Sequence, residues 1–412
     1  MNFYNQFIKT LSDKSYETVK HTLETQYNIN TYLDINLGAY ILLHNDNTKK
    51  HTDFDDELNK QMVYNTRGLI VEYTLHKPVC NAVPIQIELD KFELPTLKHE
   101  EIYNYMEIVE GTYIRLYFHN GVWRFATTRM MDSSHPRAKW STNKTFKQLF
   151  LDVLTYKSTP IDFSKLNVQY TYQFILQHPE NRVVHSHTNY GLNLYALYDN
   201  LTLQQISVQS DDYIFNICSK IEKHKLTMED TIQITHTIED DTTNELGYMV
   251  FDETYCYKIS TNVYKHDAGL ILNTASIVER FIKLIRTISE KEDEDEETAI
   301  NKYKKSFPED VMSIENLENK LNHIVNDVYR LYGMRFKRPS SNMPRRILTP
   351  NDGFIQTVHY PILLGIHKLY CDVLQPQHKT VQLEDVKNFI VNTCDEKKTV
   401  KLLEAYVNVT VN

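Results

Sequence analysis

The segment at residues 106–128 constrains the fold more than any other part of the chain. Apolar and polar residues alternate on both sides of Asn120-Gly121. Asn-Gly between two alternating runs is the strongest short-range signal for a β-hairpin with a two-residue turn. The first predicted strand opens with the sequence IVEG at residues 108–111, and the second strand follows Gly121. We therefore expect an antiparallel sheet built around this hairpin.

Composition and charge exclude several classes of protein. Hydrophobic residues make up 41% of the 412 residues and charged residues 24%, which is typical of a soluble globular chain. The net charge of −9 argues against a surface that is basic throughout, so any nucleic-acid site would have to be local. The five cysteines lack metal-binding or CxxC spacing, which predicts reduced thiols. Neither a membrane-spanning run nor a signal-peptide core is present, so we expect an intracellular, cytoplasmic protein with no membrane partner.

The pattern of apolar and polar residues along the sequence predicts three regions. Residues 1–60 read as a lead-in helix, with apolar residues at 3, 7, 8 and 11, followed by a polar loop. Residues 61–270 contain short alternating strands separated by polar turns, with one helix expected at 145–154. Residues 271–412 are helical. This order predicts an α+β protein, in which a domain of antiparallel and mixed sheets precedes a helical C-terminal domain.

The helical region has three predicted helices and one charged run. Apolar residues at 277, 281, 282 and 285 form a stripe that ends in the acidic run 290–297, which we expect to be a solvated loop. Ser313 is the predicted N-cap of a second helix and Gly333 its C-terminal stop. A last helix is predicted over 383–408, with a break near Asp395.

The strand region carries a series of short motifs in a particular order. They are RGLIVE at 67–72, PVCNAVP at 78–84, IVEG at 108–111, TTR at 127–129, FIL at 174–176 with PENRVV at 179–184, LGYMV at 246–250 and YKIS at 257–260. In this order they resemble the nucleotidyltransferase domain of the T4 RNA ligase 1 family. That family belongs to the covalent nucleotidyltransferase superfamily, together with DNA ligases and mRNA capping enzymes. The resemblance spans most of the chain and implies an ATP-grasp-like ligase fold.

The resemblance also implies a chemistry. In the family, the lysine of a KxDG motif attacks the α-phosphate of ATP, and the resulting lysyl-AMP passes its AMP to an RNA 5′-phosphate before that end is joined to a 3′-hydroxyl. The amine must be desolvated and unprotonated to react. Carboxylates on two later strands help to hold Mg²⁺ and the nucleoside, and two late lysines contact phosphates.

This sequence lacks the charges that the chemistry needs. Ile108 stands at the position of the nucleophilic lysine. Ile175 and Leu246 replace the two carboxylates, and Ser260 replaces the second of the late lysines. Glu245 precedes Leu246, but it could substitute only if a bulge re-aimed it, because a one-residue slip turns a side chain to the other face. The set of losses resembles the RNA-ligase-like proteins of large DNA viruses, which would place the chain in host cytoplasm or a virion.

Two functions follow. The first is a pseudoenzyme that has lost lysine-based adenylylation and binds RNA, a nucleotide or a protein partner, the last through the helical C-terminal domain. The alternative is an active ATP-dependent RNA ligase or nucleotidyltransferase, using ATP and Mg²⁺, with an unconventional nucleophile or with charges that were replaced deliberately. The number of losses favours the first, because an engineered trap would normally spare the two glutamates and the last lysine. No cofactor is otherwise predicted.

Candidate binding residues fall into two groups. The nucleotide-binding candidates are Arg67, Glu110, Gly111, Arg115, Arg129 and Lys258; for each, an ordinary structural role is the competing interpretation. The RNA-binding candidates interleave basic side chains with an aromatic one around a Pro-rich turn, a pattern suited to backbone phosphates and base stacking, although pairing with the acidic run is the rival interpretation. They are Arg335, Phe336, Lys337, Arg338, Arg345 and Arg346.

Histidines between 178 and 187 were the remaining candidates. His185 and His187 alternate on a predicted strand, but no third ligand stands at a recognisable spacing, so no metal site is predicted. In the polar segment 178–182, Arg182 is expected to hold a turn.

Overall fold

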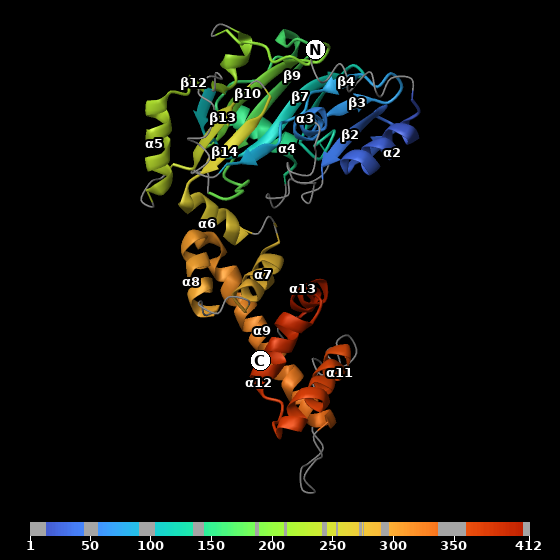
Figure 1. The fold of residues 1–412 in the computed structure, drawn as a ribbon, viewed down its shortest axis with the longest axis vertical. Helices are drawn as coiled ribbons and strands as arrows, with labels where there is room; N and C mark the ends of the chain where they lie inside the picture. The colour runs from blue at the N-terminus through green and yellow to red at the C-terminus, as the bar shows by residue number, and fades with distance from the viewer. Residues whose placement is uncertain are drawn as a thin grey trace. The chain divides into compact units, whose positions relative to one another are not determined.

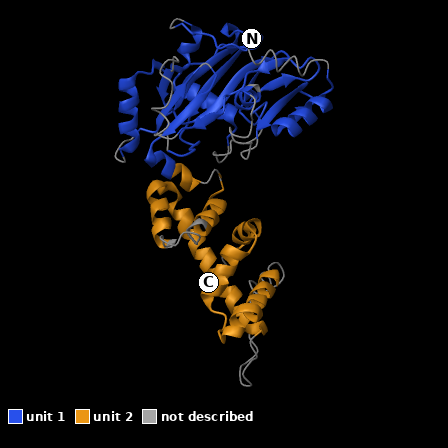
Figure 2. Ribbon diagram, viewed as in Figure 1, with its two compact units in different colours: residues 1–266 blue, residues 267–412 orange. Residues whose placement is uncertain are grey.

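The chain divides into two compact units, residues 1–266 and residues 267–412 (Figure 2). The computed structural model describes residues 14–44, 57–89, 104–134, 144–185, 189–209, 212–240, 245–252, 254–271, 274, 276–289, 296–336 and 360–406. Unit 1 contains antiparallel and mixed sheets, and unit 2 is helical (Figure 1). The predicted α+β class is therefore confirmed. The sequence placed its boundary at residue 270, and the independent folding of each part stays a prediction.

The predicted hairpin is present. Strand β7 (Thr112–His119) pairs antiparallel with β8 (Val122–Ala126). The two turn residues, Asn120 and Gly121, have φ angles of 52° and 77°. Positive φ at both central positions defines the turn that matches the right-handed twist of paired strands, and Asn-Gly adopts it at low cost.

The hairpin belongs to a five-stranded sheet with the order β11-β10-β9-β7-β8. Its other strands are β9 (Tyr170–Gln177), β10 (Gly191–Asp199) and β11 (Ser219–Lys220). Helix α4 (Phe146–Tyr156) packs on one face through Leu149, Phe150 and Val153, which are fully buried. Thr145 caps α4, because its side chain accepts a hydrogen bond from the Gln148 backbone N–H. The Gln148 side chain in turn accepts one from the Thr145 backbone N–H. The helix predicted over 145–154 is confirmed.

A second five-stranded sheet has the order β12-β6-β13-β14-β5. Its strands are β5 (Gln86–Glu88), β6 (Asn104–Glu107), β12 (His224–Lys225), β13 (Gly247–Phe251) and β14 (Cys256–Ser260), and α5 (Met228–Glu239) packs against it through Ile234 and Ile238. Because β6 belongs to this sheet and β7 to the other, residues 108–111 form the crossover between two sheets. The prediction that they begin the hairpin strand was wrong, since apolar alternation does not specify which sheet a strand joins.

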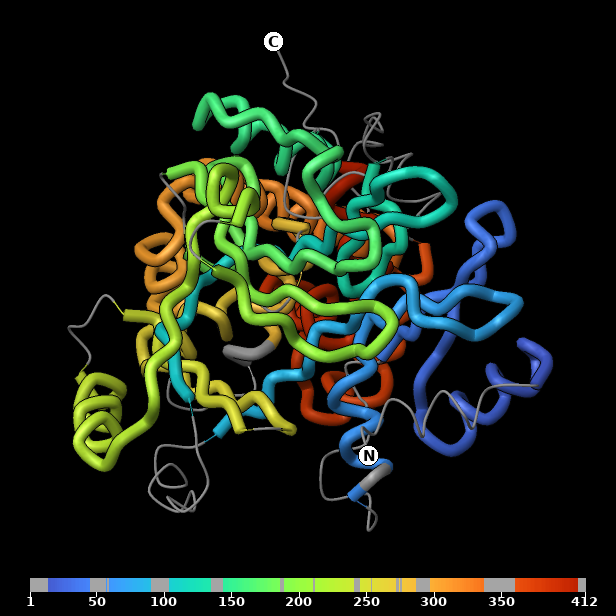
Figure 3. Tube along the Cα trace, turned by 90° about the horizontal axis from the view of Figure 1, so that it is seen from above, coloured from blue at the N-terminus to red at the C-terminus, as the bar shows by residue number. Residues whose placement is uncertain are grey.

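A four-stranded sheet, β1-β2-β3-β4, completes unit 1. Its strands are β1 (Ile29–Asp34), β2 (Ala39–His44), β3 (Ile70–Glu72) and β4 (Pro78–Cys80). Helices α2 (Tyr16–Tyr27) and α3 (Glu57–Asn65) pack on it through Val19, Leu23, Met62 and Val63. Helices α2 and α5 lie at opposite ends of unit 1 (Figure 1, Figure 3). The sequence predicted a lead-in helix and loop over residues 1–60, whereas the described residues 29–44 form a β-hairpin.

Helices dominate unit 2. They are α6 (Asn262–Ile271), which contains the unit boundary, α7 (Ile277–Ser289), α8 (Glu296–Ser306), α9 (Val311–Phe336), α11 (Tyr360–Leu369), α12 (Leu383–Asn388) and α13 (Glu396–Ala405). The predicted apolar stripe of α7 is confirmed by buried Phe281, Ile282 and Ile285. The break near Asp395 is confirmed too, because Asp395 caps α13 by accepting a hydrogen bond from the Lys398 backbone.

Two predicted limits of helix α9 were wrong. The helix begins at Val311, after a turn at Pro308–Asp310, so Ser313 lies inside it. It also continues through Gly333 to Phe336. A glycine inside a helix costs only about 1 kcal/mol relative to alanine, and the buried stripe that includes Leu331 and Tyr332 outweighs that cost.

Several other features depart from or lie beyond the predictions. Residues 183–185, predicted as strand, form a bend. The predicted helix at residues 3–11, residues 290–295 of the acidic run and residues 407–408 of the last predicted helix lie outside the described residues. No helix within the described ranges has the length and apolarity needed to cross a membrane.

Candidate active-site region

The position predicted for a nucleophile lies against an apolar cluster. Ile108 packs, partly buried, against a cluster that takes side chains from both five-stranded sheets. The buried members come from β6, β9, β10, β13 and β14: Met106, Ile175, Tyr195, Ala196, Met249 and Cys256. The backbone N–H of Ile108 donates to the Gly247 carbonyl (2.9 Å), which fixes the crossover against β13. We call these residues, together with Ile108, the apolar cluster.

Ile175 occupies the first lost carboxylate position and is fully buried. A Cβ atom at Gly111 would lie 2.7 Å from Ile175 Cγ2 and 2.5 Å from the Leu176 carbonyl oxygen. Gly111 also has a φ of +158°. The glycine therefore allows the crossover to approach β9 closely, and the isoleucine fills the space beside it.

The second lost carboxylate position also lacks a free acidic group. Leu246 is partly buried immediately before β13. Glu245 is exposed, and its carboxylate accepts a hydrogen bond from the Tyr248 hydroxyl. Ser260, at the position of the late lysine, is 1% exposed. Mg²⁺ and a triphosphate need oxygen ligands and cations, and Ile108, Ile175 and Leu246 offer neither, so this region does not fit the group that the family resemblance implies.

A charged cluster lies near the same crossover. Glu110 is 5% exposed, and its two carboxylate oxygens accept hydrogen bonds from the backbone N–H groups of Val184 (2.6 Å) and His185 (2.8 Å). Burial raises the pKa of Glu110, while these two donors and the nearby His185 and Arg182 act in the opposite direction. Glu110 therefore holds the bend at residues 183–185 in place.

Lys258 faces this carboxylate from β14. Its Nζ lies 4.6 Å from the ring centroid of Tyr264. Desolvation lowers the pKa of Lys258, and the charges of Glu88 and Glu110 partly oppose the shift. The ring of His185 meets the edge of Tyr264 at 5.6 Å. We call Glu110, His185, Lys258, Tyr264 and Glu88 the charged cluster.

Sequence patterns identified only part of the charged cluster. Glu110 and Lys258 were predicted from motif positions. Tyr264 and Glu88 were missed, because they come from α6 and β5 and no spacing in the chain brings them together. His185 was considered only as a metal ligand, and within the described residues no group of three or more His, Cys, Asp or Glu side chains is arranged to hold a metal ion.

Arg115 is a buried structural residue. It is 0% exposed and donates three hydrogen bonds to main-chain carbonyls: Gly68 (2.5 Å) and Asn81 (2.8 Å) from Nη1, and Thr127 (2.5 Å) from Nη2. These carbonyls belong to three separated segments of unit 1. Arg115 therefore joins the segments that carry the other two candidate arginines, Arg67 and Arg129, through its Nη1 and Nη2 atoms.

The other two arginines have different surroundings. Arg67 is half-buried. The pKa of His44 falls to about 3, chiefly because His44 is buried and secondly because the positive charge of Arg67 is near. Arg129 is exposed, and its backbone N–H donates to the Thr127 hydroxyl (3.3 Å). A nucleotide-binding role stays a prediction for both residues.

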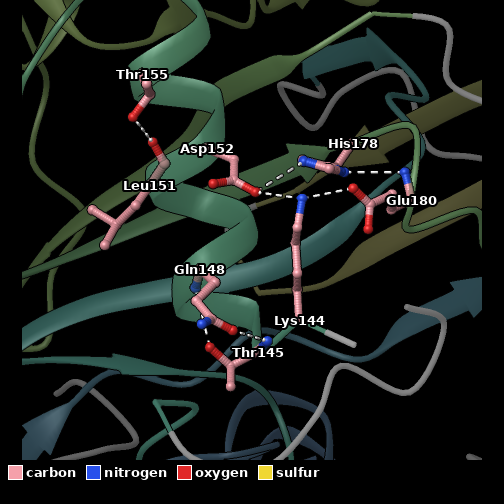
Figure 4. A network of polar contacts seen from close by, with 8 residues as sticks. All are labelled: Lys144, Thr145, Gln148, Leu151, Asp152, Thr155, His178 and Glu180. Atoms are coloured by element: carbon pink, nitrogen blue, oxygen red, sulfur yellow. Dashed lines mark hydrogen bonds and ion pairs between the residues drawn. The ribbon is translucent and has the colours of Figure 1, made fainter. Parts of the chain in front are cut away.

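The polar segment at residues 178–182 takes part in an ionic network (Figure 4). Lys144 Nζ lies 2.9 Å from an Asp152 oxygen and 2.6 Å from a Glu180 oxygen. His178 is fully buried, and its Nδ1 accepts a hydrogen bond from the Glu180 backbone (3.0 Å). Arg182 Nε donates to the Val184 carbonyl (2.7 Å), which agrees with its expected role in a turn. The network ties α4 to the segment after β9.

Only the start of the predicted RNA-binding segment lies within the described residues. Arg335 is exposed; its guanidinium lies 4.4 Å from the Tyr360 ring centroid and donates to the Tyr360 hydroxyl (2.7 Å). Phe336 stacks on His367 at 4.0 Å. Lys337, Arg338, Arg345 and Arg346 lie outside the described residues.

Several solved structures are similar to this chain at low sequence identity. No protein-family model matches the chain, and no curated protein sequence matches it significantly. The structure is similar to two forms of an archaeal ATP-dependent RNA ligase. One has 10% identity and a TM-score of 0.46 over 78% of this chain and 82% of that chain. The other has 10% identity and a TM-score of 0.41 over 80% and 83%.

A further similar structure is a Naegleria gruberi RNA ligase variant with AMP and Mn, which has 11% identity and a TM-score of 0.29 over 45% of this chain and 58% of that one. All three likenesses concern the arrangement of the chain and not its activity.

Proposed function

We propose that this chain is an RNA-binding protein with a ligase-like arrangement of strands that does not form a lysyl-nucleotide at residue 108. One observation carries the proposal: Ile108 and Ile175 belong to an apolar cluster that joins the two sheets. A reacting amine there would need cations beside it to neutralise the phosphates and carboxylates to hold the metal, and the apolar cluster supplies neither. Glu110 and Arg115, which retain their charges nearby, are hydrogen-bonded within the protein.

The RNA ligand follows from the order of the strand motifs and from the basic segment that begins at Arg335. Arg335 lies exposed beside two aromatic rings, those of Phe336 and Tyr360. A guanidinium among aromatic rings suits an RNA strand, because phosphates pair with the cation and bases stack on the rings.

The first experiment tests the loss of nucleotidyl transfer. The full chain is incubated with α-labelled ATP or GTP and Mg²⁺ or Mn²⁺, denatured and analysed for retained label, with an active RNA ligase in parallel. We expect no label on this chain. A stoichiometric covalent nucleotide would overturn the non-catalytic part of the proposal.

The second experiment tests RNA binding by fluorescence anisotropy with a short single strand. Affinity should fall steeply as salt rises, and the triple change of Arg335, Lys337 and Arg338 to Ala should flatten that dependence. The matched control changes Lys397, Lys398 and Lys401, three exposed lysines of α13, to Ala. If the two triple variants change RNA affinity and its salt dependence equally, binding depends only on the net charge of the protein. That result would contradict the assignment of RNA binding to this segment.

A second candidate function is supported by Lys258. Its Nζ lies 4.6 Å from the ring centroid of Tyr264, and desolvation lowers its pKa, although the charges of Glu88 and Glu110 oppose the shift. An amine with a lowered pKa is a better nucleophile at neutral pH. An enzyme using Lys258 would carry the covalent label there. Peptide mapping of any labelled protein, and its loss in the Lys258→Met variant, distinguishes this candidate from the first.

A further inference from the structure

Three side chains that together can activate a thiol meet at the end of helix α11 in unit 2. Cys371 lies in a π-helical turn at Tyr370–Leu374, four residues after His367 of α11. Residues four apart on a helix share one face, and the Cys371 Sγ lies 3.8 Å from the His367 Nε2. The His367 Nδ1 lies 3.4 Å from the hydroxyl oxygen of Tyr332 on α9. We call Cys371, His367 and Tyr332 the thiol cluster.

Aromatic packing holds the imidazole of this cluster. Phe336 stacks on the His367 ring with the centroids 4.0 Å apart and the planes 11° apart. The ring of Tyr370 is also nearly parallel to it, at 6.2 Å and 21°. A base that is in contact with a nucleophile and is oriented by a third group is the arrangement that activates a thiol. The imidazole is therefore held with Nε2 toward the sulfur.

The other cysteines lack this combination of access and a neighbouring base. All five cysteines lie within the described residues, and Cys371 alone is exposed. Burial raises the pKa of the other four thiols, which are Cys80, Cys218, Cys256 and Cys394. The thiolate is the reactive form, so these four should react slowly with reagents in solution.

We propose that Cys371 is a site of thiol–disulfide exchange with low-molecular-weight disulfides such as oxidised glutathione. The thiol proton passes to His367 Nε2 as the Cys371 Sγ attacks one sulfur of the disulfide. A new S–S bond forms to Cys371 and the S–S bond of the reagent breaks. Its other half leaves with the bonding electron pair and takes the proton from His367, so no further oxidant is needed.

Tyr332 is a positioning residue in this proposal. When both ring nitrogens of His367 carry a proton, the Nδ1–H donates to the Tyr332 oxygen and the Nε2–H donates to the thiolate. Burial raises the pKa of Tyr332 to about 12, and the nearby Cys371 and Tyr370 act in the same direction. The Tyr332 hydroxyl therefore stays neutral near pH 7. The site goes beyond the function proposed above and does not depend on residue 108 or on RNA.

Other titratable and charged side chains lie on the elements around the pair. The segment Phe389–Thr393 also packs on α11 and carries none. Because such groups are the same in the wild type and in a His367 variant, the difference between the two pH profiles reports the imidazole. On α9 they are Tyr332 and Arg335, and beside the pair in sequence they are Lys368, Tyr370 and Asp372.

The rate of thiol exchange on the full chain tests the site. Reduced protein is mixed with the aromatic disulfide dithiobis(nitrobenzoate), and release of the coloured thiolate is followed with time. A second sample is treated with oxidised glutathione and mapped by peptide mass spectrometry. We expect one fast-reacting thiol, and a glutathione adduct at Cys371. Cys371→Ser should remove the fast phase, whereas the matched control Cys394→Ser should retain it.

The pH profile of that rate tests the histidine. An unassisted thiol is only a few per cent ionised at pH 7, so His367→Phe, which keeps an aromatic ring beside Phe336, should slow exchange roughly tenfold there. Above about pH 9.5 an ordinary thiol ionises without help, and the two rates should agree. Tyr332→Phe should slow exchange at pH 7 roughly twofold, the effect of one weak hydrogen bond. The control His323→Phe, at an exposed histidine of α9, should keep the wild-type profile.

Three results would overturn the site. They are a fast phase that maps to another cysteine, parallel pH profiles for the wild type and His367→Phe, and equal slowing by His323→Phe and His367→Phe. Thermal unfolding midpoints show whether each variant is folded. If His367→Phe is unfolded, His367→Gln, which also removes the base, takes its place in the same comparison.

Discussion

The apolar cluster and the charged cluster both take a residue from the crossover at residues 108–111, Ile108 for the first and Glu110 for the second. They differ in whether the charges of the motif remain. At Ile108 and Ile175 the charges of the motif are gone, and aliphatic side chains fill the space between two sheets. At Glu110 and Lys258 the charges remain, but each has a partner in the protein: two backbone N–H groups for Glu110 and an aromatic ring for Lys258. A retained charge is therefore not by itself a retained active site.

The largest effect is expected when a carboxylate is restored to the apolar cluster. Ile175→Glu places a charge at a fully buried position within the apolar cluster, which should destabilise the protein by about 4 kcal/mol. Chemical denaturation measures the change. Ile175→Val, which removes one methylene, should cost about 1 kcal/mol. Equal stability of the Ile175→Glu variant and the wild type would show that the apolar cluster is hydrated. It would contradict the contrast drawn between the apolar cluster and the charged cluster.

The second largest loss of stability is expected at Arg115, whose buried guanidinium donates hydrogen bonds to three main-chain carbonyls. Arg115→Met should cost about 3 kcal/mol, because it leaves three main-chain carbonyls without their donor. Arg129→Met, at an exposed position, should change stability by no more than about 0.5 kcal/mol. Similar losses in both variants, measured by thermal unfolding, would contradict the buried structural role.

Gly111 connects the two clusters, and its substitution should have an intermediate effect. Gly111→Ala should cost about 2 kcal/mol, because the new Cβ would meet the Leu176 carbonyl at 2.5 Å. Gly269→Ala is the control, since Gly269 lies in helix α6 with open space around its Cβ direction; that change should be neutral or stabilising. Unfolding midpoints compare the two. A neutral Gly111→Ala would mean that the crossover can move away from β9.

The smallest effect is a change in pH dependence at Glu110. Burial raises the pKa of this carboxyl in the folded state, so its contribution to stability is fully present below the unfolded pKa and is lost as pH rises through the raised folded pKa. The wild type should therefore lose stability relative to Glu110→Gln as pH rises above the ordinary glutamate pKa of about 4.3. If the free energies of unfolding of the two proteins change with pH in parallel, burial does not disfavour the ionised form of Glu110 in the folded state.

Local signals in the sequence predicted the local structure well. The Asn120-Gly121 turn, the Thr145 cap of α4 and the Asp395 break each depend on residues within a few positions of one another. Helix α5 was missed although Thr227 and Asp230 form a capping box, which is a visible signal at its start. The sheet to which β6 belongs could not be predicted, because Met106 pairs with Met249, a residue far away in the chain.

The candidate site was predictable only as a set of losses. The motif order indicated that Ile108, Ile175 and Leu246 replace charges. No pattern showed that Ile108 packs against the buried cluster to which Ile175 belongs. Arg115 was a nucleotide-binding candidate because it could face the same cleft as Arg67 and Arg129. Its three carbonyl partners lie in segments distant in sequence, so its burial became visible only in the structure.

The crossover at residues 108–111 also bears on the order in which unit 1 folds. The β7-β8 hairpin closes a two-residue loop, whereas β6 must find β13 across more than half of the unit. Closing long loops costs entropy before the contacts repay it, so non-local strand pairs form late. We expect the sheet with β6 and β13 to form after the hairpin, and Ile108, whose backbone bonds to Gly247, to be among the last residues protected from hydrogen exchange during refolding.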